Sequence, residues 1–140
     1  MARWLIKSEP GVYAWEDLVR DGRTSWDGVR NAQARNALRA MRAGDLCLYY
    51  HSGAERRVVG VAEVVREAYP DPTANDGDWC AVDVAPAFPL KVAVPLAAIR
   101  AEPSLAGMVL LKQGRLSVSP VSDPEFGRIL ALGKTRRKAV

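Results

Sequence analysis

Residues 26–36 combine one large aromatic ring with the polar groups that recognise a flat heterocycle. The segment reads WDGVRNAQARN and contains a tryptophan, two arginines and three side-chain amides. An aromatic face stacks on a planar ring, amides pair with the donors and acceptors of a base edge, and guanidinium groups hold phosphates. The combination therefore favours a nucleobase pocket over bond-breaking chemistry. The alternative is that Trp26 belongs to the core and that the remaining residues begin a polar helix.

The sequence signatures of common catalytic sites are absent. The chain contains no Gly-x-Gly-x-x-Gly or Walker-type glycine loop and no Gly-x-Ser-x-Gly elbow. His51 is the single histidine, and Ser52 beside it would point to the opposite face of a strand, which disfavours a nucleophile–base pair. Two cysteines and one histidine cannot complete a four-ligand zinc site. We therefore expect no catalytic residue, metal or cofactor; an enzyme or an acid-rich metal site that uses His51 is the alternative.

The excess of positive charge lies in the last eight residues. These residues contain no acid and four cations, which are Lys134, Arg136, Arg137 and Lys138. The rest of the chain has equal numbers of basic and acidic residues. A basic tail contacts phosphates by releasing counterions, or it only increases solubility. We assign residues 1–133 to one domain and residues 134–140 to a basic tail that is expected to be disordered.

Hydropathy and cysteine usage bear on the compartment. No apolar run approaches the ~18 residues that a membrane helix requires, and the apolar stretch near the start is too short for a signal peptide. Cys47 and Cys80 lie far apart in apolar segments without a Cys-x-x-Cys pair, which suits a reducing compartment. The sequence thus predicts a cytoplasmic protein without a membrane partner, and a monomer is favoured.

Short β-type runs and helical segments follow one another without strict alternation. Strands are predicted at residues 3–7, 46–50, 58–65, 79–84, 91–94 and 115–118. Helices are predicted at residues 14–21 and 31–43, at a short segment after Pro95, and from the capping box at Ser122 to Leu132. This order favours an α+β fold, with a small, twisted, mostly antiparallel β-barrel and helices packed around it, over a doubly wound sheet.

Two local signals refine this pattern. Gly60 inside a valine-rich strand predicts a bulge or a close backbone contact. Pro70 and Pro72 predict an irregular connector after the third strand. In the helix at residues 31–43, three arginines recur every three or four positions and would place cations beside the Trp26 turn, unless they form an ordinary solvated face; they are Arg35, Arg39 and Arg42.

Six short motifs occur in one order along nearly the whole chain. They are WLIKSEP at 4–10, WDGVRN at 26–31, QARN at 33–36, YHS at 50–52, EAYPD at 67–71 and RLSV at 115–118. In this set the chain resembles the EVE domain family, a part of the PUA-like superfamily. The resemblance implies a PUA-like β-barrel with a pocket for a modified base, notably 5-methylcytosine or 5-hydroxymethylcytosine in DNA. PUA-like relatives bind RNA, so DNA and RNA both stay open as partners.

The resemblance also implies which residues form the site. The base pocket would be lined by Trp26, Asn31, Lys7, Ser8, His51, Ser52 and Arg115. Phosphates would be contacted by Arg30, Arg35, Arg39 and the tail residues Lys134, Arg136, Arg137 and Lys138. The chain departs from its relatives at Ala32, where they often carry an aromatic, and in a shorter segment between Tyr69 and Trp79. These departures imply a wider pocket and a smaller contribution from that loop.

The resulting hypothesis is a binding module that holds a single-stranded or flipped base against Trp26. Under this hypothesis, Trp26→Ala abolishes base-dependent binding and leaves the fold intact. Two other classes of function remain: an enzyme acting on nucleic acid or nucleotides through His51, and a small-molecule or protein-interaction module on the same barrel.

Overall fold

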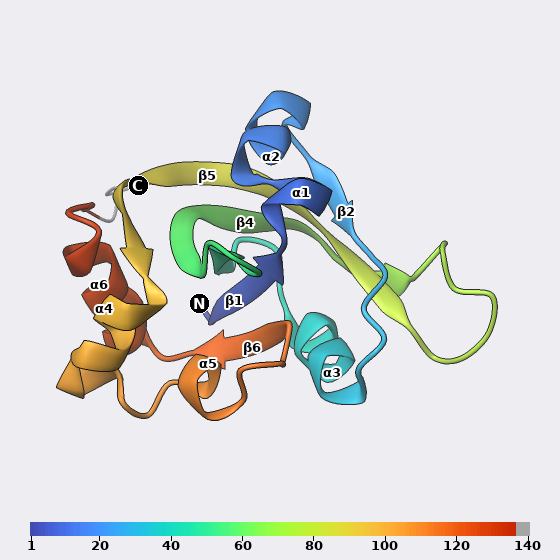
Figure 1. Cartoon of the computed structure of the whole chain (residues 1–140). Helices are drawn as coiled ribbons and strands as arrows, with labels where there is room; N and C mark the ends of the chain where they lie inside the picture. The colour runs from blue at the N-terminus through green and yellow to red at the C-terminus, as the bar shows by residue number, and fades with distance from the viewer. Residues whose placement is uncertain (137–140) are drawn as a thin grey trace.

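A curved six-stranded sheet with helices packed around it forms the body of the protein (Figure 1). The computed structural model describes residues 1–136. The strands are β1 (Arg3–Ser8), β2 (Thr24–Trp26), β3 (Leu46–His51), β4 (Arg57–Pro70), β5 (Cys80–Pro95) and β6 (Val118–Val121). The helices are α1 (Pro10–Tyr13), α2 (Trp15–Asp21), α3 (Ala32–Ala40), α4 (Leu96–Ala101), the 3₁₀ turn η1 (Pro103–Leu105), α5 (Val109–Lys112) and α6 (Asp123–Leu132).

The strands hydrogen-bond in the order β2-β5-β4-β3-β1-β6. β1 and β3 are parallel, whereas the other four neighbouring pairs are antiparallel. The predicted α+β class and mostly antiparallel pairing are therefore confirmed. The predicted closed barrel is not: within residues 1–136, the ladder ends at β2 on one edge and at β6 on the other. Helix α3 contacts β6, β5 and β4 and thus covers the opening.

The β4–β5 hairpin differs most from the sequence prediction. Residues 79–84 and 91–94 belong to one long strand, and the predicted connector up to Pro70 is part of β4. The antiparallel ladder shifts register at four places along this hairpin. Such irregularities bend a strand and accommodate prolines, so the prolines that suggested breaks mark bends instead. β6 is likewise displaced from the predicted 115–118 to residues 118–121, with a proline at the sheet edge.

Two local predictions are confirmed. The ladder shifts register at Gly60, and a Cβ added there would lie 2.7 Å from the Trp15 ring. The glycine is therefore required by the close approach of Trp15. The capping box of α6 is also present, since the Ser122 hydroxyl accepts from the Glu125 amide and the Glu125 carboxylate accepts from the Ser122 amide.

The sheet separates two apolar clusters because neighbouring residues of a strand face opposite sides. In β1, Trp4 and Ile6 belong to a cluster that includes Trp26 and residues of α2 and α3. Leu5, between them, belongs to a second cluster with Phe126 of α6 and residues of α4 and α5. We call them the Trp26 cluster and the α6 cluster. Each cluster adjoins a cavity.

Candidate functional site

A cavity of about 480 Å³ lies beside the Trp26 ring. Its walls come from the end of β1, from α1, from residues 24–30 and from residue 117. These segments are distant in the sequence. They meet because β1 ends next to the turn that follows β2 (Figure 1). We call this space the Trp26 cavity. It is lined by two cationic residues, Lys7 and Arg30, and one acidic residue, Asp27, among hydroxyl and aromatic groups.

Trp26 itself is both a core residue and a wall of the cavity. The residue is only 8% exposed, and its ring meets the Tyr49 ring at 81° with the centroids 5.5 Å apart. Tyr49 makes a similar edge contact with Trp15. The indole is therefore largely covered rather than free-standing. This burial overturns the expectation that the fold tolerates Trp26→Ala, because truncating a buried tryptophan costs about 3–5 kcal/mol.

The turn after Trp26 is held by the buried carboxylate of Asp71. One carboxylate oxygen accepts from the Gly28 amide at 2.8 Å and from the Arg30 guanidinium at 2.9 Å. The other accepts from the amide and the hydroxyl of Thr73 at 2.7 and 2.6 Å. Gly28 has φ +76°, a conformation that glycine adopts without steric cost. Asp71 thus fixes the cavity wall from the far end of β4.

The four hydrogen bonds determine the charge of Asp71. Burial by itself raises the pKa of a carboxyl group, since it disfavours the charged form. The bonds from Thr73, Arg30 and Gly28 outweigh that effect and hold the pKa of Asp71 well below its usual range. The group is therefore a permanent anion that organises the turn, and sequence reasoning missed it. The signal was present, because Asp71 ends the EAYPD motif and Gly28 and Arg30 lie in the WDGVRN motif.

Hydrogen bonds of two tyrosines hold the wall that α1 contributes. The Tyr49 hydroxyl donates to the Tyr13 carbonyl at 2.8 Å, which attaches the end of α1 to β3. Burial raises the pKa of Tyr49 above its usual range, so this hydroxyl stays protonated. Tyr13 in turn donates to Asp21 at 2.8 Å. Neither tyrosine was singled out from the sequence.

Lys7 stands at the edge of the cavity. Its ammonium group donates to the Gly114 carbonyl at 2.6 Å, and burial lowers the pKa of Lys7 from its usual value. Lys7 also lines a neighbouring hollow of about 270 Å³ that includes Ser52. Ser8, Lys7 and Trp26 are the members of the predicted base pocket that line the Trp26 cavity.

Asn31 and Arg115 lie elsewhere. The Asn31 side chain accepts from the Ala34 amide at 2.9 Å and caps the N-terminus of α3. Asn31, Gln33 and Arg115 line a separate hollow of about 260 Å³. The residue set implied by the resemblance is therefore divided among adjacent hollows rather than gathered in one pocket.

His51 is a buried structural residue. Its Nε2 atom accepts from the Trp15 amide at 3.0 Å, and this contact places the proton on Nδ1, which donates to Glu55 at 3.0 Å. The bond from His51 lowers the pKa of Glu55. Both ring nitrogens hold the start of α2 and the loop after β3, and His51 is not among the residues that line the Trp26 cavity.

The three predicted phosphate-binding arginines contact the loop between β4 and β5, which projects from the body (Figure 1). Arg30 bonds Asp71, Arg39 bonds the Asp78 carboxylate at 2.8 Å, and Arg35 donates to the Asp78 carbonyl. Arg30 and Arg35 also lie over the Trp79 ring, at 5.7 and 5.4 Å from its centroid. Their charges are largely engaged within the protein.

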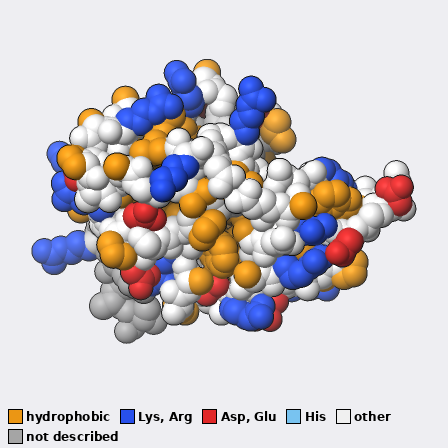
Figure 2. Space-filling model, turned by 90° about the horizontal axis from the view of Figure 1, so that it is seen from below, with side chains coloured by type: hydrophobic (Ala, Val, Ile, Leu, Met, Phe, Trp, Pro, Cys, Tyr) orange, Lys and Arg blue, Asp and Glu red, His pale blue; other side chains and the backbone are white. Residues whose placement is uncertain are grey.

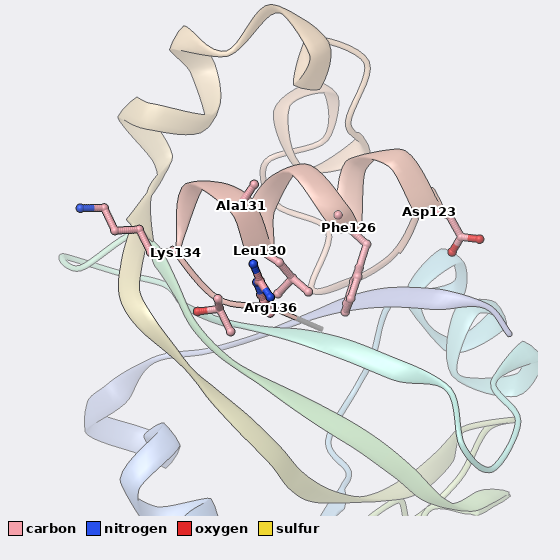
Figure 3. Close-up of a pocket in the computed structure, with 8 residues that line it drawn as sticks. Asp123, Phe126, Leu130, Ala131, Lys134 and Arg136 are labelled. Atoms are coloured by element: carbon pink, nitrogen blue, oxygen red, sulfur yellow. The ribbon is translucent and has the colours of Figure 1, made fainter. Parts of the chain in front are cut away.

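A second cavity, of about 430 Å³, lies against α6, and we call it the α6 cavity. Figure 3 shows Phe126 and Leu130 pointing from α6 toward the same side as Arg136. Lys134 and Arg136 of the predicted tail line it, whereas Arg137 and Lys138 lie outside the described residues. On the face shown in Figure 2, Lys and Arg side chains are dispersed rather than gathered in one patch.

Within residues 1–136, no cluster of three or more His, Cys, Asp or Glu side chains is arranged to hold a metal ion. No helix within the same range is long and apolar enough to span a membrane.

Comparison with known proteins places these observations in a family. A sequence model of the EVE domain matches residues 2–132. Human thymocyte nuclear protein 1 is 36% identical over an alignment of 165 positions, which covers 94% of this chain and 73% of that protein.

Solved structures agree in fold over almost the full length. The NMR structure of Rpa0253 from Rhodopseudomonas palustris has a TM-score of 0.91 at 47% identity, covering 96% of this chain and 94% of that one. The crystal structure of the human THYN1 protein in complex with 5-methylcytosine-containing DNA has a TM-score of 0.88 at 34% identity. That match covers 98% of this chain and 100% of the human one.

Proposed function

The chain belongs to the EVE domain family, and from this premise we propose that it is a nucleic-acid-binding module that holds a modified base in the Trp26 cavity. The base is a modified cytosine, such as 5-methylcytosine or 5-hydroxymethylcytosine. The observation that carries the proposal is the cavity of about 480 Å³ that has Trp26 in its wall and Lys7 and Arg30 beside it. That volume lies within the range of pockets that enclose small planar ligands. The human relative solved with 5-methylcytosine-containing DNA supports the choice of ligand.

In this proposal the exposed part of the Trp26 ring contacts the base. Stacking on an aromatic side chain is worth about 1–3 kcal/mol per base. Ser8 lies in the same cavity and reads the base edge. A methyl group at ring carbon 5 adds about 0.8 kcal/mol when buried, so preference for the methylated base is several-fold. A hydroxymethyl group with a matched hydrogen bond discriminates more strongly.

The position of His51 supports binding rather than catalysis. An acid–base group has to reach the substrate and exchange a proton with it. His51 is 3% exposed, and both of its ring nitrogens are engaged. In this proposal the curved sheet takes the part of the PUA-like barrel, and α3 covers the gap between β6 and β2. A cytoplasmic location stays a prediction.

The preferred target is a single strand or a weakly paired base. Flipping a base out of a duplex costs a few kcal/mol, which consumes most of the gain from stacking. The remaining affinity comes from phosphate contacts, which do not read the sequence.

The experiment uses one exposed apolar residue at the cavity and a matched one elsewhere. Val12 on α1 lines the Trp26 cavity and is 77% exposed, whereas Val19 on α2 is 54% exposed and does not line it. Val12→Glu places a negative charge at the cavity, and we expect it to weaken binding of a single-stranded oligonucleotide containing 5-methylcytosine by roughly tenfold. Val19→Glu is expected to bind as the unmodified protein does, and both variants should unfold at nearly the same temperature.

Fluorescence anisotropy with labelled oligonucleotides that contain cytosine, 5-methylcytosine or 5-hydroxymethylcytosine measures both affinity and preference. Equal affinity for all three bases would contradict recognition of the modification. Equal binding by the two glutamate variants would contradict the assignment of the Trp26 cavity as the site.

A further inference from the structure

We propose that a hollow next to the Trp26 cavity is a phosphate subsite, which takes the backbone phosphate of the nucleotide adjacent to the held base. The hollow has a volume of about 270 Å³ and is lined by side chains from β1, β3, the loop after β3, α4 and α5. Its polar residues are Lys7, Tyr50, Ser52, Arg56 and Arg100. We call it the Arg56–Arg100 hollow. The inference rests on the proposed function and adds Arg56 and Arg100, which the sequence did not point to, to the predicted site residues Lys7 and Ser52.

The charge of this hollow has one sign. Three cationic side chains line it, and no acidic side chain does. Its hydroxyl groups come from Tyr50 and Ser52. Guanidinium and ammonium groups together with hydroxyls are the groups that hold phosphate oxygens in nucleic-acid complexes.

The two guanidinium groups have no acidic partner in the protein. Within residues 1–136, neither Arg56 nor Arg100 has a carboxylate within 4 Å, and neither side chain donates a hydrogen bond there. Arg57, the neighbour of Arg56, instead bonds Glu55 at 2.9 Å. Two of the three arginines that were predicted to bind phosphates are likewise paired with an aspartate. An anion that enters the hollow therefore displaces no carboxylate of the described residues from these two guanidinium groups.

Both guanidinium groups act on Tyr50, which also lines the hollow. Burial raises the pKa of the Tyr50 hydroxyl, and the positive charges of Arg56 and Arg100 oppose this effect. The Lys7 ammonium lies 5.6 Å from the centroid of the Tyr50 ring. Three cations thus surround one tyrosine, and they approach it from three different elements of the fold.

The loop that presents Arg56 is fixed in an uncommon conformation. Arg56 has φ +47°, a left-handed conformation that non-glycine residues adopt rarely. Its carbonyl accepts from the Leu96 amide at 2.9 Å, which attaches the loop to the start of α4, the helix that carries Arg100. Strained backbone of this kind is concentrated at functional sites. The contact keeps the two arginines on neighbouring, mutually anchored segments.

Lys7 connects the hollow to the base cavity. It lines both spaces, and its bond to the Gly114 carbonyl lies where they adjoin. Leu96, Leu110 and Leu111 give the hollow an apolar side that suits a sugar ring. A strand with its base beside Trp26 can therefore continue past Lys7 and place its next phosphate between Arg56 and Arg100.

The test compares two double variants that remove the same charge. Arg56→Gln/Arg100→Gln removes the phosphate ligands, and Arg42→Gln/Lys91→Gln removes two cations that line neither space. Glutamine is long and unbranched, so it suits the Arg56 conformation about as well as arginine does. The probes are a single-stranded oligonucleotide containing 5-methylcytosine, the nucleoside 5-methyl-2′-deoxycytidine, which has no phosphate, and inorganic pyrophosphate.

We expect the Arg56/Arg100 variant to bind the oligonucleotide about fivefold more weakly than the control at ~0.1 M salt, because one phosphate contact on a single strand contributes a salt slope of about 0.7. The slope of log Kd against log salt should fall by about the same ~0.7. Both variants should bind the nucleoside equally. Pyrophosphate should shift the backbone amide resonances of residues 52–56 and 96–100 in the unmodified protein and not in the Arg56/Arg100 variant.

The outcomes separate the subsite from the base cavity. Equal oligonucleotide affinity and equal salt slope in the two double variants would overturn the subsite while the base cavity stands. Weaker nucleoside binding in the Arg56/Arg100 variant would also overturn it, since the arginines would then contact the base. If the unmodified protein binds neither nucleoside nor oligonucleotide, the proposed function fails. In that case, resonance shifts with pyrophosphate at residues 52–56 and 96–100 would still support an anion site in the hollow, and the absence of these shifts would overturn it.

Discussion

The Trp26 cavity and the α6 cavity have similar volumes, about 480 and 430 Å³, but they are built in different ways. The walls of the Trp26 cavity come from segments distant in sequence and are held by hydrogen bonds that need no ligand, such as those from Gly28 and Arg30 to Asp71 and from Tyr49 to Tyr13. The α6 cavity is formed by one helix face and the three residues 134–136. Preorganised walls distinguish a binding site from a surface depression, because they place the contacts before the ligand arrives.

Individual charged side chains near the two cavities show the same difference. Asp71 connects the two sequence motifs that flank the Trp26 cavity, whereas Arg3 near the α6 cavity has a buried Nε atom without a hydrogen-bond partner among the described residues. The Arg3 guanidinium lies over the Phe126 ring, 5.0 Å from its centroid, and 3.9 Å from Asp123. The buried carboxylate of Asp71 is thus fully hydrogen-bonded, whereas the buried guanidinium of Arg3 is not.

The largest expected effect comes from truncating Trp26, which is both a wall of the cavity and a core residue. Trp26→Ala should lower the free energy of unfolding by about 3–5 kcal/mol, because the ring is buried against Tyr49. Urea denaturation followed by Tyr and Trp fluorescence measures the loss, with Val19→Ala as the exposed control. A loss below about 1 kcal/mol would show that the ring contributes little packing and would return it to the role of a free stacking surface.

The next effect tests the buried carboxylate. Asp71→Asn keeps the shape of the side chain but turns one acceptor into a donor opposite Gly28, Arg30 or Thr73. We expect unfolding to become easier by about 2–3 kcal/mol and oligonucleotide binding to weaken by roughly tenfold. Asp76→Asn is the control, since Asp76 is exposed, makes no side-chain hydrogen bond or ion pair within residues 1–136 and should change neither quantity. Unchanged binding by Asp71→Asn would show that the turn held by Asp71 does not contribute to oligonucleotide binding.

The pH dependence of stability sharpens the role of Asp71. Its pKa in the folded protein lies well below the value of about 3.9 expected for an unfolded chain. The stabilisation is therefore fully present above pH ~4 and is lost as the pH falls toward the folded pKa. The difference in unfolding free energy between the unmodified protein and Asp71→Asn should be constant from pH 7 to about 5 and should shrink below about 4. A difference that grows on acidification would contradict the assignment.

The smallest effect is expected at the α6 cavity. Lys134→Gln/Arg136→Gln should weaken binding to all oligonucleotides equally, by about twofold, because these cations contribute only long-range attraction to phosphates. The ratio of affinities for 5-methylcytosine and cytosine should not change. Competition anisotropy measures that ratio directly, and a changed ratio would mean that the C-terminal residues contact the base.

The sequence predicted the elements whose signals are local. The apolar runs at residues 3–7 and 46–50, the capping box at Ser122 and the glycine at position 60 each depend on a few neighbouring residues, and each is present in the structure. The β4–β5 hairpin was divided wrongly because prolines at register shifts look like strand ends. β2 was missed because three residues carry no periodic pattern.

The site was predictable only in part, for a chemical reason. Side-chain amides that read a base and side chains that cap a helix are the same residue types, so Asn31 fitted both roles. Likewise, an arginine that binds phosphate cannot be told from one that pairs with an acid until the fold brings Asp71 and Asp78 beside Arg30 and Arg39. Arg56, Arg100 and Lys7 line one hollow but come from three separate segments of the chain. No local sequence pattern therefore predicts that they lie together.

The hairpin between β4 and β5 is anchored on both sides of its tip. Asp71 holds one side to the turn after β2, Asp78 holds the other to α3, and the Asp71 amide bonds the Trp79 carbonyl across the base of the loop. Residues 75–77 between these anchors make no hydrogen bond to another segment of the described chain. Insertions at this tip can lengthen the arm without disturbing either anchor, which makes it a natural place for length variation among relatives and a suitable point for attaching a fluorophore.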